Sequence, residues 1–490
     1  MLYLRKTQRF MTSGIALALM LALPSAFQAP EALAQQHRNL PEIGTTGAGF
    51  MSIEREKVVG DYYMRQLRAT APVIQDPVLN SYLKDVGQRL VRNADNVRYP
   101  FSFFWLNINE INAFAFMGGY VGVHTGLIQQ ARNESEFAAV LGHEIAHVTQ
   151  RHIVRSMQEQ QQNMPLTIAG VIGSILLGIA NPEAGAAGLY TTIGATGQAQ
   201  INYTRLFEQE ADRIGITTLA NAGFDPMGAP NFFGRLADQY RYVSKPPEML
   251  LTHPVPESRI ADTRTRAEAL GRRDVPQSLN FELAKARVDA RYTRSTPNSE
   301  FVKMTKSDNI ITQQAGGYAL AIRALDASNP DTAQQWLTPL LERDPRNRFY
   351  IDVQTDIYLA LEQNDKALDM LKREYTRSPD DPVIILNYAN AAIRSNEAEL
   401  GVKLLRNYLL AEPGSLIALD LLTDAYQRTS DRAAMYETRA EALALRGGFD
   451  LAIDQLQTAQ NHTQNKLTEK RLNARIDQIR AEKERLKGLL

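Results

Sequence analysis

Residues 134–152 read ESEFAAVLGHEIAHVTQRH, and this stretch decides what the rest of the chain is built to support. Asn133 can cap a helix that enters at Glu134, and the absence of proline predicts that this helix continues past His152. Within it, His143-Glu144-Ile145-Ala146-His147 matches His-Glu-x-x-His, in which a spacing of four puts both imidazoles on one helical face. The alternative is a surface helix with incidental histidines, so a third metal ligand elsewhere in the chain is needed.

Glu208-Gln209-Glu210-Ala211-Asp212 supplies that ligand on a second predicted helix. Zinc binds imidazole nitrogen and carboxylate oxygen, and a catalytic zinc has three protein ligands and one open position. Glu208 is the expected third ligand, and Asp212, four residues on, can accept a hydrogen bond from the free nitrogen of a ligating histidine. Alone, such an acidic pair is typical of a solvated helix face, and only the upstream motif changes that interpretation.

The pattern therefore predicts one zinc ion per chain, held by His143, His147 and Glu208. Glu144 would lie beside the open position. As a general base it would take a proton from water and later deliver it to a leaving amine. The predicted chemistry is hydrolysis of peptide bonds within a protein chain, with Asp212 as a supporting residue.

Joined in this order, the two motifs resemble the gluzincin pattern of the HtpX and CAAX prenyl-protease superfamily. Asn112-Ala113-Phe114-Ala115 with Gly118-Gly119 resembles the substrate-side strand of that superfamily, although Met117 stands where many members have proline. Thr252-His253-Pro254, followed by Arg259-Ile260, resembles its later His-Pro element. An extended substrate could pair with the strand near residues 112–123 by β-augmentation.

Three other histidines and one arginine are further candidates for a role at this site. The resemblance supports His253 as a latent fourth zinc ligand that excludes water, and the alternative is a structural or substrate-contacting histidine. Arg259 could stabilise an oxyanion, but a structural ion pair is favoured. No spacing argument ties His124 or His152 to the metal, and neither is given a role.

Around this site the sequence predicts an α+β, mostly helical fold. Helical spacing over residues 50–91 predicts a lead-in, and 101–106 and 120–124 have the composition of strands joined by a turn in a small sheet. We expect the gluzincin metallopeptidase domain to span residues 35–270, with a polar connector at 271–310.

The last part, residues 311–490, is predicted to be an all-α tetratricopeptide solenoid. Two kinds of residue recur every 34 positions: the prolines Pro345, Pro379 and Pro413, and the small residues Ala333, Ala367 and Gly401. The period is expected to slip after Arg428, and the charged helix from Lys466 is expected to cap the array. Such arrays have concave grooves that bind peptides or partner helices, whereas coincidental spacing in an ordinary helical domain is the alternative.

The first 34 residues resemble a secretory signal, with basic Arg5, Lys6 and Arg9, a short apolar run and a small-x-small site at 32–34. A cleaved signal 1–34 places the mature chain in a periplasm. The chain has no cysteine, so a metal site must use histidine and carboxylates. Lys plus Arg and Asp plus Glu both number 54, which gives no field favouring nucleic acid.

Residues 165–180 are nearly all apolar, with interspersed glycines. A buried helical hairpin, a flap over the active site and a segment in peripheral contact with a membrane all remain open for this stretch, since about 20 apolar residues are needed to span a bilayer.

The resemblance, together with the signal and the repeats, implies periplasmic quality control of outer-membrane proteins. Expected clients are misfolded or stalled outer-membrane proteins, with a chaperone-like role in β-barrel and lipopolysaccharide-transport protein assembly. The β-barrel assembly machinery is the expected partner of the repeats. The alternative is a chaperone or scaffold in which the repeats do the work and the zinc domain is latent or structural.

Overall fold

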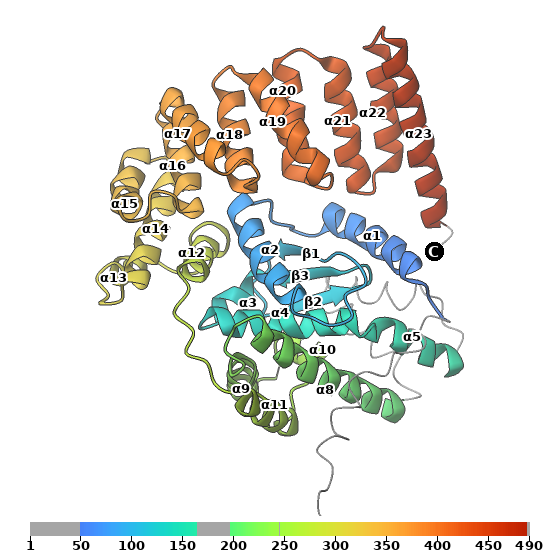
Figure 1. Ribbon diagram of the computed structural model, residues 1–490, viewed down its shortest axis with the longest axis vertical. Helices are drawn as coiled ribbons and strands as arrows, with labels where there is room; N and C mark the ends of the chain where they lie inside the picture. Colours follow the sequence, from blue (N-terminus) through green and yellow to red (C-terminus); the bar gives the residue numbers. More distant parts are fainter. Residues whose placement is uncertain (1–49, 164–196, 245, 488–490) are drawn as a thin grey trace, which may run out of the picture. The chain divides into compact units, whose positions relative to one another are not determined.

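The computed structural model describes residues 50–163, 197–244 and 246–487. This part of the chain is mostly helical, with one small sheet in its first half and a series of paired helices in its second half (Figure 1), so the predicted α+β class is confirmed. The expected signal 1–34 and the apolar stretch 165–180 lie outside the described residues. No helix within the described ranges combines the length and the apolar character needed to cross a membrane.

The sheet has three strands, in the order β1-β3-β2. Strands β1 (Ser102–Leu106) and β3 (Tyr120–His124) confirm the two predicted strands, but they are parallel neighbours and no simple turn joins them. Between them in sequence comes β2 (Ala113–Phe116), which is antiparallel to β3 and lies at the sheet edge. The turn from β2 to β3 contains Gly118 and Gly119 with φ of 85° and 84°, a conformation that glycine adopts without strain.

Helices cover both faces of this sheet (Figure 1). Alternate side chains of β1 point to opposite faces, so that Phe104 and Leu106 pack in one apolar cluster with α1 (Ile53–Thr70). Trp105 points the other way, toward α2 (Pro77–Val91), where its indole N–H donates to the Leu79 carbonyl at 2.9 Å. The helical lead-in predicted over 50–91 is therefore two helices, one on each face.

The predicted helix over residues 134 to beyond 152 is interrupted, and that expectation was wrong. Helix α4 (Glu134–Thr149) begins at the Asn133 cap as expected, but it ends before Arg151, and α5 (His152–Asn163) starts a new direction. Arg151 has a left-handed φ of 53°. Its buried guanidinium holds that conformation by pairing with Glu56 of α1, with an Nη2–Oε1 distance of 2.6 Å.

Helix α8 (Gly197–Asn221) packs along α4, and two glycines set how closely they approach. A Cβ atom on Gly215 would lie 3.0 Å from the backbone nitrogen of His143, and one on Gly142 would lie 3.2 Å from the Gly215 carbonyl. Any larger side chain at either position would push the helices apart. Helices α9 (Gly228–Tyr240) and α11 (Glu257–Leu270) pack against this pair, and α3 (Thr125–Gln130) and α10 (Glu248–Thr252) complete this part of the chain.

The stretch 271–310, expected to be a polar connector, contains helical structure from residue 279 onward. Helix α12 (Leu279–Arg287) runs into the π-helical turn η2 (Val288–Thr293), and α13 (Asn298–Met304) follows. These elements pack against α2 and the first repeat helices because they carry buried side chains among their polar ones.

Paired helices then repeat with a constant interval. Every second helix, beginning at residues 330, 364, 398 and 432, keeps an interval of 34 residues. The residues Ser328, Glu362, Asn396 and Ser430, in the turns before these helices, keep the same interval and all have positive φ. The period therefore persists through residue 432, and the slip predicted after Arg428 was wrong. The helices are α14 (Ile310–Asp326), α15 (Pro330–Arg343), α16 (Arg348–Ala360), α17 (Asn364–Arg377), α18 (Pro382–Arg394), α19 (Ala398–Ala411), α20 (Leu416–Arg428), α21 (Arg432–Leu445), α22 (Phe449–Asn461) and α23 (Lys466–Lys487).

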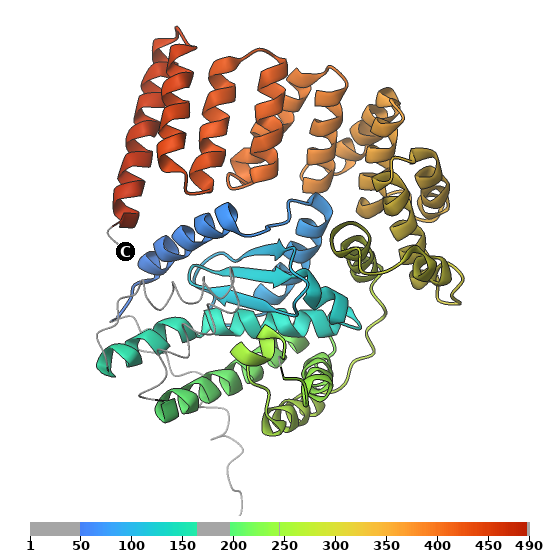
Figure 2. The same cartoon turned by 180° about the vertical axis from the view of Figure 1, so that it is seen from behind.

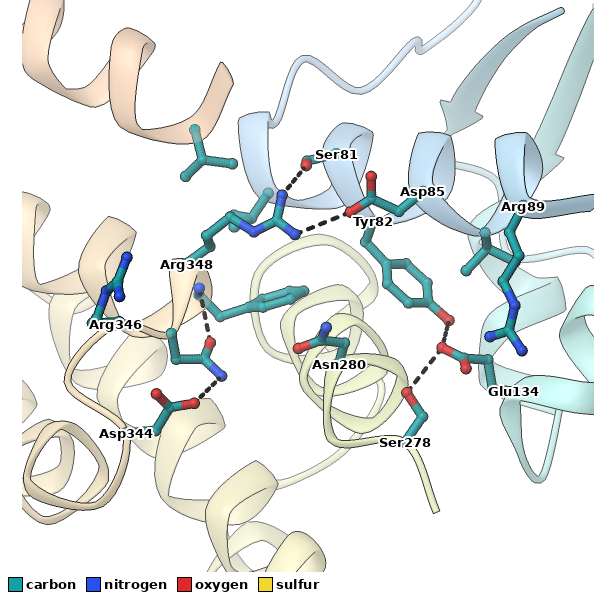
Figure 3. Close-up of a pocket in the computed structure, with 15 residues that line it drawn as sticks. Ser81, Tyr82, Asp85, Arg89, Glu134, Ser278, Asn280, Asp344, Arg346 and Arg348 are labelled. Atoms are coloured by element: carbon teal, nitrogen blue, oxygen red, sulfur yellow. Dashed lines mark hydrogen bonds and ion pairs between the residues drawn. The ribbon is translucent and has the colours of Figure 1, made fainter. Parts of the chain in front are cut away.

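A polar cleft of about 400 Å³ lies where α2 meets the start of α16 (Figure 3). Arg348 crosses it and donates to the Ser81 hydroxyl at 2.9 Å and to Asp85 at 3.1 Å. On another wall, the Tyr82 hydroxyl donates to Glu134 at 3.2 Å. Within this cleft, the Arg348–Asp85 contact thus joins the two parts of the chain, whereas Tyr82 and Glu134 belong to one part.

A buried ion cluster beside this cleft joins the same two parts. Arg287 is 2% exposed and lies 2.7 Å from Asp76, the cap of α2, and 2.8 Å from Asp352 of α16. The Tyr292 hydroxyl also donates to Asp76, at 2.7 Å. One guanidinium therefore neutralises carboxylates from elements far apart in the sequence.

We predict that Arg287→Met lowers the free energy of unfolding by about 3–5 kcal/mol, because it leaves two buried carboxylates without their cation. Arg294→Met is the matched control, since the Arg294 side chain is 60% exposed and lies 3.7 Å from Asp326. Its expected cost is below about 1 kcal/mol. Urea unfolding of both variants measures the difference, and equal midpoints would contradict a structural role for the cluster.

Candidate metal centre

Four side chains bring one ligand atom each into a single cluster. His143 and His147 come from α4, Glu208 from α8 and His253 from the end of α10, and their ligand atoms all lie within 4.8 Å of one another. The Nε2 atoms of His143 and His147 are 3.0 Å apart. Glu208 oxygens lie 3.3 Å from each of these nitrogens, and His253 Nδ1 lies 3.0 Å from Glu208 Oε1.

These separations fit zinc. Ligand atoms about 2.1 Å from a tetrahedral zinc lie about 3.4 Å from each other. The five closest contacts in this cluster, from 3.0 to 3.4 Å, are near that spacing, and the donor set of imidazole nitrogens and a carboxylate is the one zinc prefers. The residues that the sequence singled out as ligands are thus brought together by the fold.

Asp212 and Arg259 lie behind this cluster. Asp212 Oδ1 is 3.1 Å from the far nitrogen of His143, which is the contact expected of it. Arg259 is 4% exposed and lies 2.7 Å from Asp212 and 2.8 Å from Glu208. Of the two alternatives for Arg259, the geometry is that of the structural ion pair.

Burial lowers the pKa values of His143 and His147, and the neighbouring carboxylates raise them, with a different net result for each residue. Burial works against a charge on His143, but hydrogen bonds with Asp212 and Glu208 outweigh it and raise its pKa to about 10. Burial lowers the pKa of His147 to about 3, although Glu208 opposes this. A cation that binds here must displace the proton that His143 carries at neutral pH, so its binding releases a proton.

Glu144 is buried beside the ligand atoms, with 1% exposure. Burial raises its pKa, and α4, which carries Glu144, packs against the edge strand β2. His253 Nε2 lies 3.6 Å from Glu144 Oε1. The same imidazole thus faces the ligand cluster with one nitrogen and the glutamate with the other.

His152 was assigned no role from the sequence, yet it contacts the cluster directly. Its Nδ1 lies 2.9 Å from Nδ1 of His147, and its Nε2 lies 3.1 Å from Glu210, which also pairs with Arg155 at 2.8 Å. The sequence signal was weak, because five residues along a continuous helix put two side chains on different faces. In the structure the helix is not continuous: it ends before Arg151, so His152 can return to the face that carries His147.

His124 is a different case. It is 2% exposed on β3, its ring meets Phe114 edge to face, and burial lowers its pKa to about 4. It is not a member of the metal cluster in the described part of the chain.

Known proteins that are similar in sequence to this chain are also peptidases. Residues 77–267 match Peptidase family M48. The chain is 42% identical to the beta-barrel assembly-enhancing protease of Escherichia coli O157:H7, over 96% of this chain and 97% of that protein. It is 43% identical to the protein of the same name from Yersinia pestis, over 91% and 93% of the two chains. A mitochondrial metalloendopeptidase, OMA1 of Arabidopsis thaliana, is 32% identical over 27% of this chain and 25% of its own.

The resemblance expected from the motifs is therefore confirmed over nearly the whole length. With its two histidines and glutamate in zinc geometry, the chain belongs to peptidase family M48 and is a zinc metallopeptidase.

Proposed function

We propose that this protein is a zinc metalloendopeptidase in which His143, His147 and Glu208 hold the metal and Glu144 is the general base. The observation that carries the proposal is the position of Glu144, which is buried beside the ligand atoms on α4, the helix that packs against the edge strand β2. Asp212 supports the site by orienting His143 through its far nitrogen.

Zinc, when bound, supplies Lewis-acid polarisation of water and of the substrate carbonyl. The residues of the chain do the rest. Glu144 accepts the proton of the attacking water and returns it to the leaving amine, and its raised pKa suits a group that must both take and give a proton. The outer edge of β2, which pairs with no other strand in the described residues, offers backbone groups to an extended substrate, which aligns a peptide bond with Glu144 while tolerating many side chains.

Replacing Glu144 with glutamine tests the base. Cleavage of an intrinsically unfolded protein should fall by at least about 10²-fold, because an amide cannot accept the proton. Zinc content should stay at one per chain. Glu54→Gln, at an exposed position of α1, is the control and should cleave normally. Retained cleavage by Glu144→Gln would rule out this assignment.

We further propose that His253 is a latch. Its Nδ1 lies 3.0 Å from Glu208 and 3.4 Å from His143 Nε2, so it takes a position that water must occupy during hydrolysis. Its Nε2 faces Glu144, and the His253 side chain is 12% exposed, on the more open side of the cluster. Displacing α10 would therefore free both the fourth position and the base.

His253→Ala should raise cleavage of the unfolded test protein several-fold, because water gains the fourth position without displacement of a ligand. Zinc content and cleavage are measured together, with His462→Ala in the repeat region as the control. Loss of cleavage with zinc retained would overturn the latch and favour the substrate-contacting alternative.

The biological setting is proposed from the names of the relatives, the expected signal 1–34 and the repeats 311–490. Both relatives are named for beta-barrel assembly, and a cleaved signal 1–34 would deliver a peptidase domain 35–270 and repeats 311–490 to the periplasm. Clients would be misfolded or stalled outer-membrane proteins, including those of lipopolysaccharide transport, and the repeats would dock on the β-barrel assembly machinery. Peripheral membrane contact by 165–180 stays a prediction.

A scaffold or chaperone is the second candidate, because His253 lies among the ligand atoms and could keep the site latent. The two separate in cells that rely on the full-length chain for β-barrel assembly. If the enzyme acts, Glu144→Gln leaves stalled barrel precursors undegraded, as seen by pulse-chase. If precursor turnover and barrel assembly match those of the unsubstituted protein, the scaffold candidate replaces the enzyme.

A further inference from the structure

We propose that His152, with Glu210 behind it, is a positioning residue that fixes the orientation and tautomer of the zinc ligand His147. This inference rests on the proposed ligand set. It is carried by two distances: 2.9 Å between the Nδ1 atoms of His147 and His152, and 3.1 Å between His152 Nε2 and Glu210.

The direction of each hydrogen bond follows from the metal site. His147 Nε2 faces the other ligand atoms and must present a lone pair to the metal, so its proton is on Nδ1. That N–H then donates to His152 Nδ1, which must be the unprotonated nitrogen. His152 Nε2 therefore carries the proton and donates to the Glu210 carboxylate. Only this arrangement of protons satisfies both hydrogen bonds in the series from His147 through His152 to Glu210.

Helix α8 thereby supplies a carboxylate behind each of the two histidine ligands. Asp212 lies directly behind His143, at 3.1 Å from its Nδ1, whereas Glu210 lies behind His147 through His152. Glu208, Glu210 and Asp212 alternate along one turn, so one segment supplies a ligand and the two acids that orient the other ligands. Carboxylates behind ligating histidines are a general means of fixing ring orientation and raising ligand basicity.

The local fold places His152 for this contact. The left-handed residue Arg151, paired with Glu56 at 2.6 Å, ends α4 and turns the chain so that His152 returns toward His147. The His152 ring then stacks on Phe207, with ring centres 4.6 Å apart and planes 19° apart. Two neighbours and a fixed backbone thus hold the imidazole in place.

The competing explanation is that His152 only packs in the core, and His124 is an example of such a histidine in this protein. His124 is as buried as His152, but neither of its ring nitrogens has a hydrogen-bond partner among the described residues. Both ring nitrogens of His152 have one, and one of these partners is a proposed zinc ligand. The two histidines differ in hydrogen bonding and not in burial.

The test is zinc affinity, measured on the full mature chain by competition with a chelator. His152→Leu should weaken zinc binding by about 10–100-fold, the usual effect of removing such a partner. His152→Gln should restore most of the affinity, because its amide oxygen can accept from His147 and its amide nitrogen can donate to Glu210. His462→Leu is the control for the same substitution away from the site.

Melting of the zinc-free variants separates positioning from simple packing. Positioning predicts a larger affinity loss for His152→Leu than for His152→Gln at equal apo stability, and an altered visible spectrum of the cobalt-substituted protein. Unchanged zinc affinity and spectrum in His152→Leu would overturn the proposal. If that variant does not fold, Glu210→Ala, at a partly exposed position, carries the test, because it removes the acceptor of the His152 N–H, and its zinc affinity must fall. His147→Ala is the reference: if it binds zinc normally, the ligand set itself fails.

Discussion

The close approach of α4 and α8 is the constraint on which the rest of the structure depends. Gly142 and Gly215 face each other where the helices are nearest, and a side chain at Gly215 would meet the backbone of His143 at 3.0 Å. Because of this contact, the two histidines of one helix and the carboxylate of the other come within bonding distance of a single ion. The sheet, α2 and α9 pack against α4 and hold it in this position, with β2 among the elements beside it.

A cluster of buried charges is costly unless each charge is compensated, and the site is organised to provide that compensation. Glu208 and Asp212 share the guanidinium of Arg259, and each carboxylate also faces a histidine. The negative charge left over by this arrangement is where a divalent cation would be held. Arg259 also donates to the carbonyl of Pro254 at 2.6 Å, so the residue that neutralises Glu208 also fixes the loop that follows His253. Ligands and proposed latch are thus parts of one ion-paired unit.

The junction between the peptidase part and the paired helices is built from the same kind of interaction. Arg287 lies between a carboxylate that caps α2 and another on α16, and Arg348 reaches from α16 to α2 across the polar cleft. Polar contacts of defined geometry specify one arrangement more strictly than apolar contact alone, since misplacement leaves a buried charge unpaired. The helical array repeats its backbone conformation every 34 residues, down to the left-handed residue before every second helix. Regular repeats and a specific junction together anchor the first units of the array, and the Arg65–Glu482 pair, at 2.6 Å, joins α1 to its last helix.

The sequence by itself determined the ligand motif, the Asn133 cap, the two acids at i and i+4 and the period of the array, because all of these are local patterns with fixed helical geometry. It also identified β1 and β3 from their composition. Only the tertiary structure decided the parallel pairing of those strands, the pairing of Arg259, the helices within 279–304 and the position of His152. Each of these depends on a partner distant in sequence. The clearest case is Arg151: its left-handed conformation is stabilised by Glu56, 95 residues earlier, and no pattern near His147 records that contact.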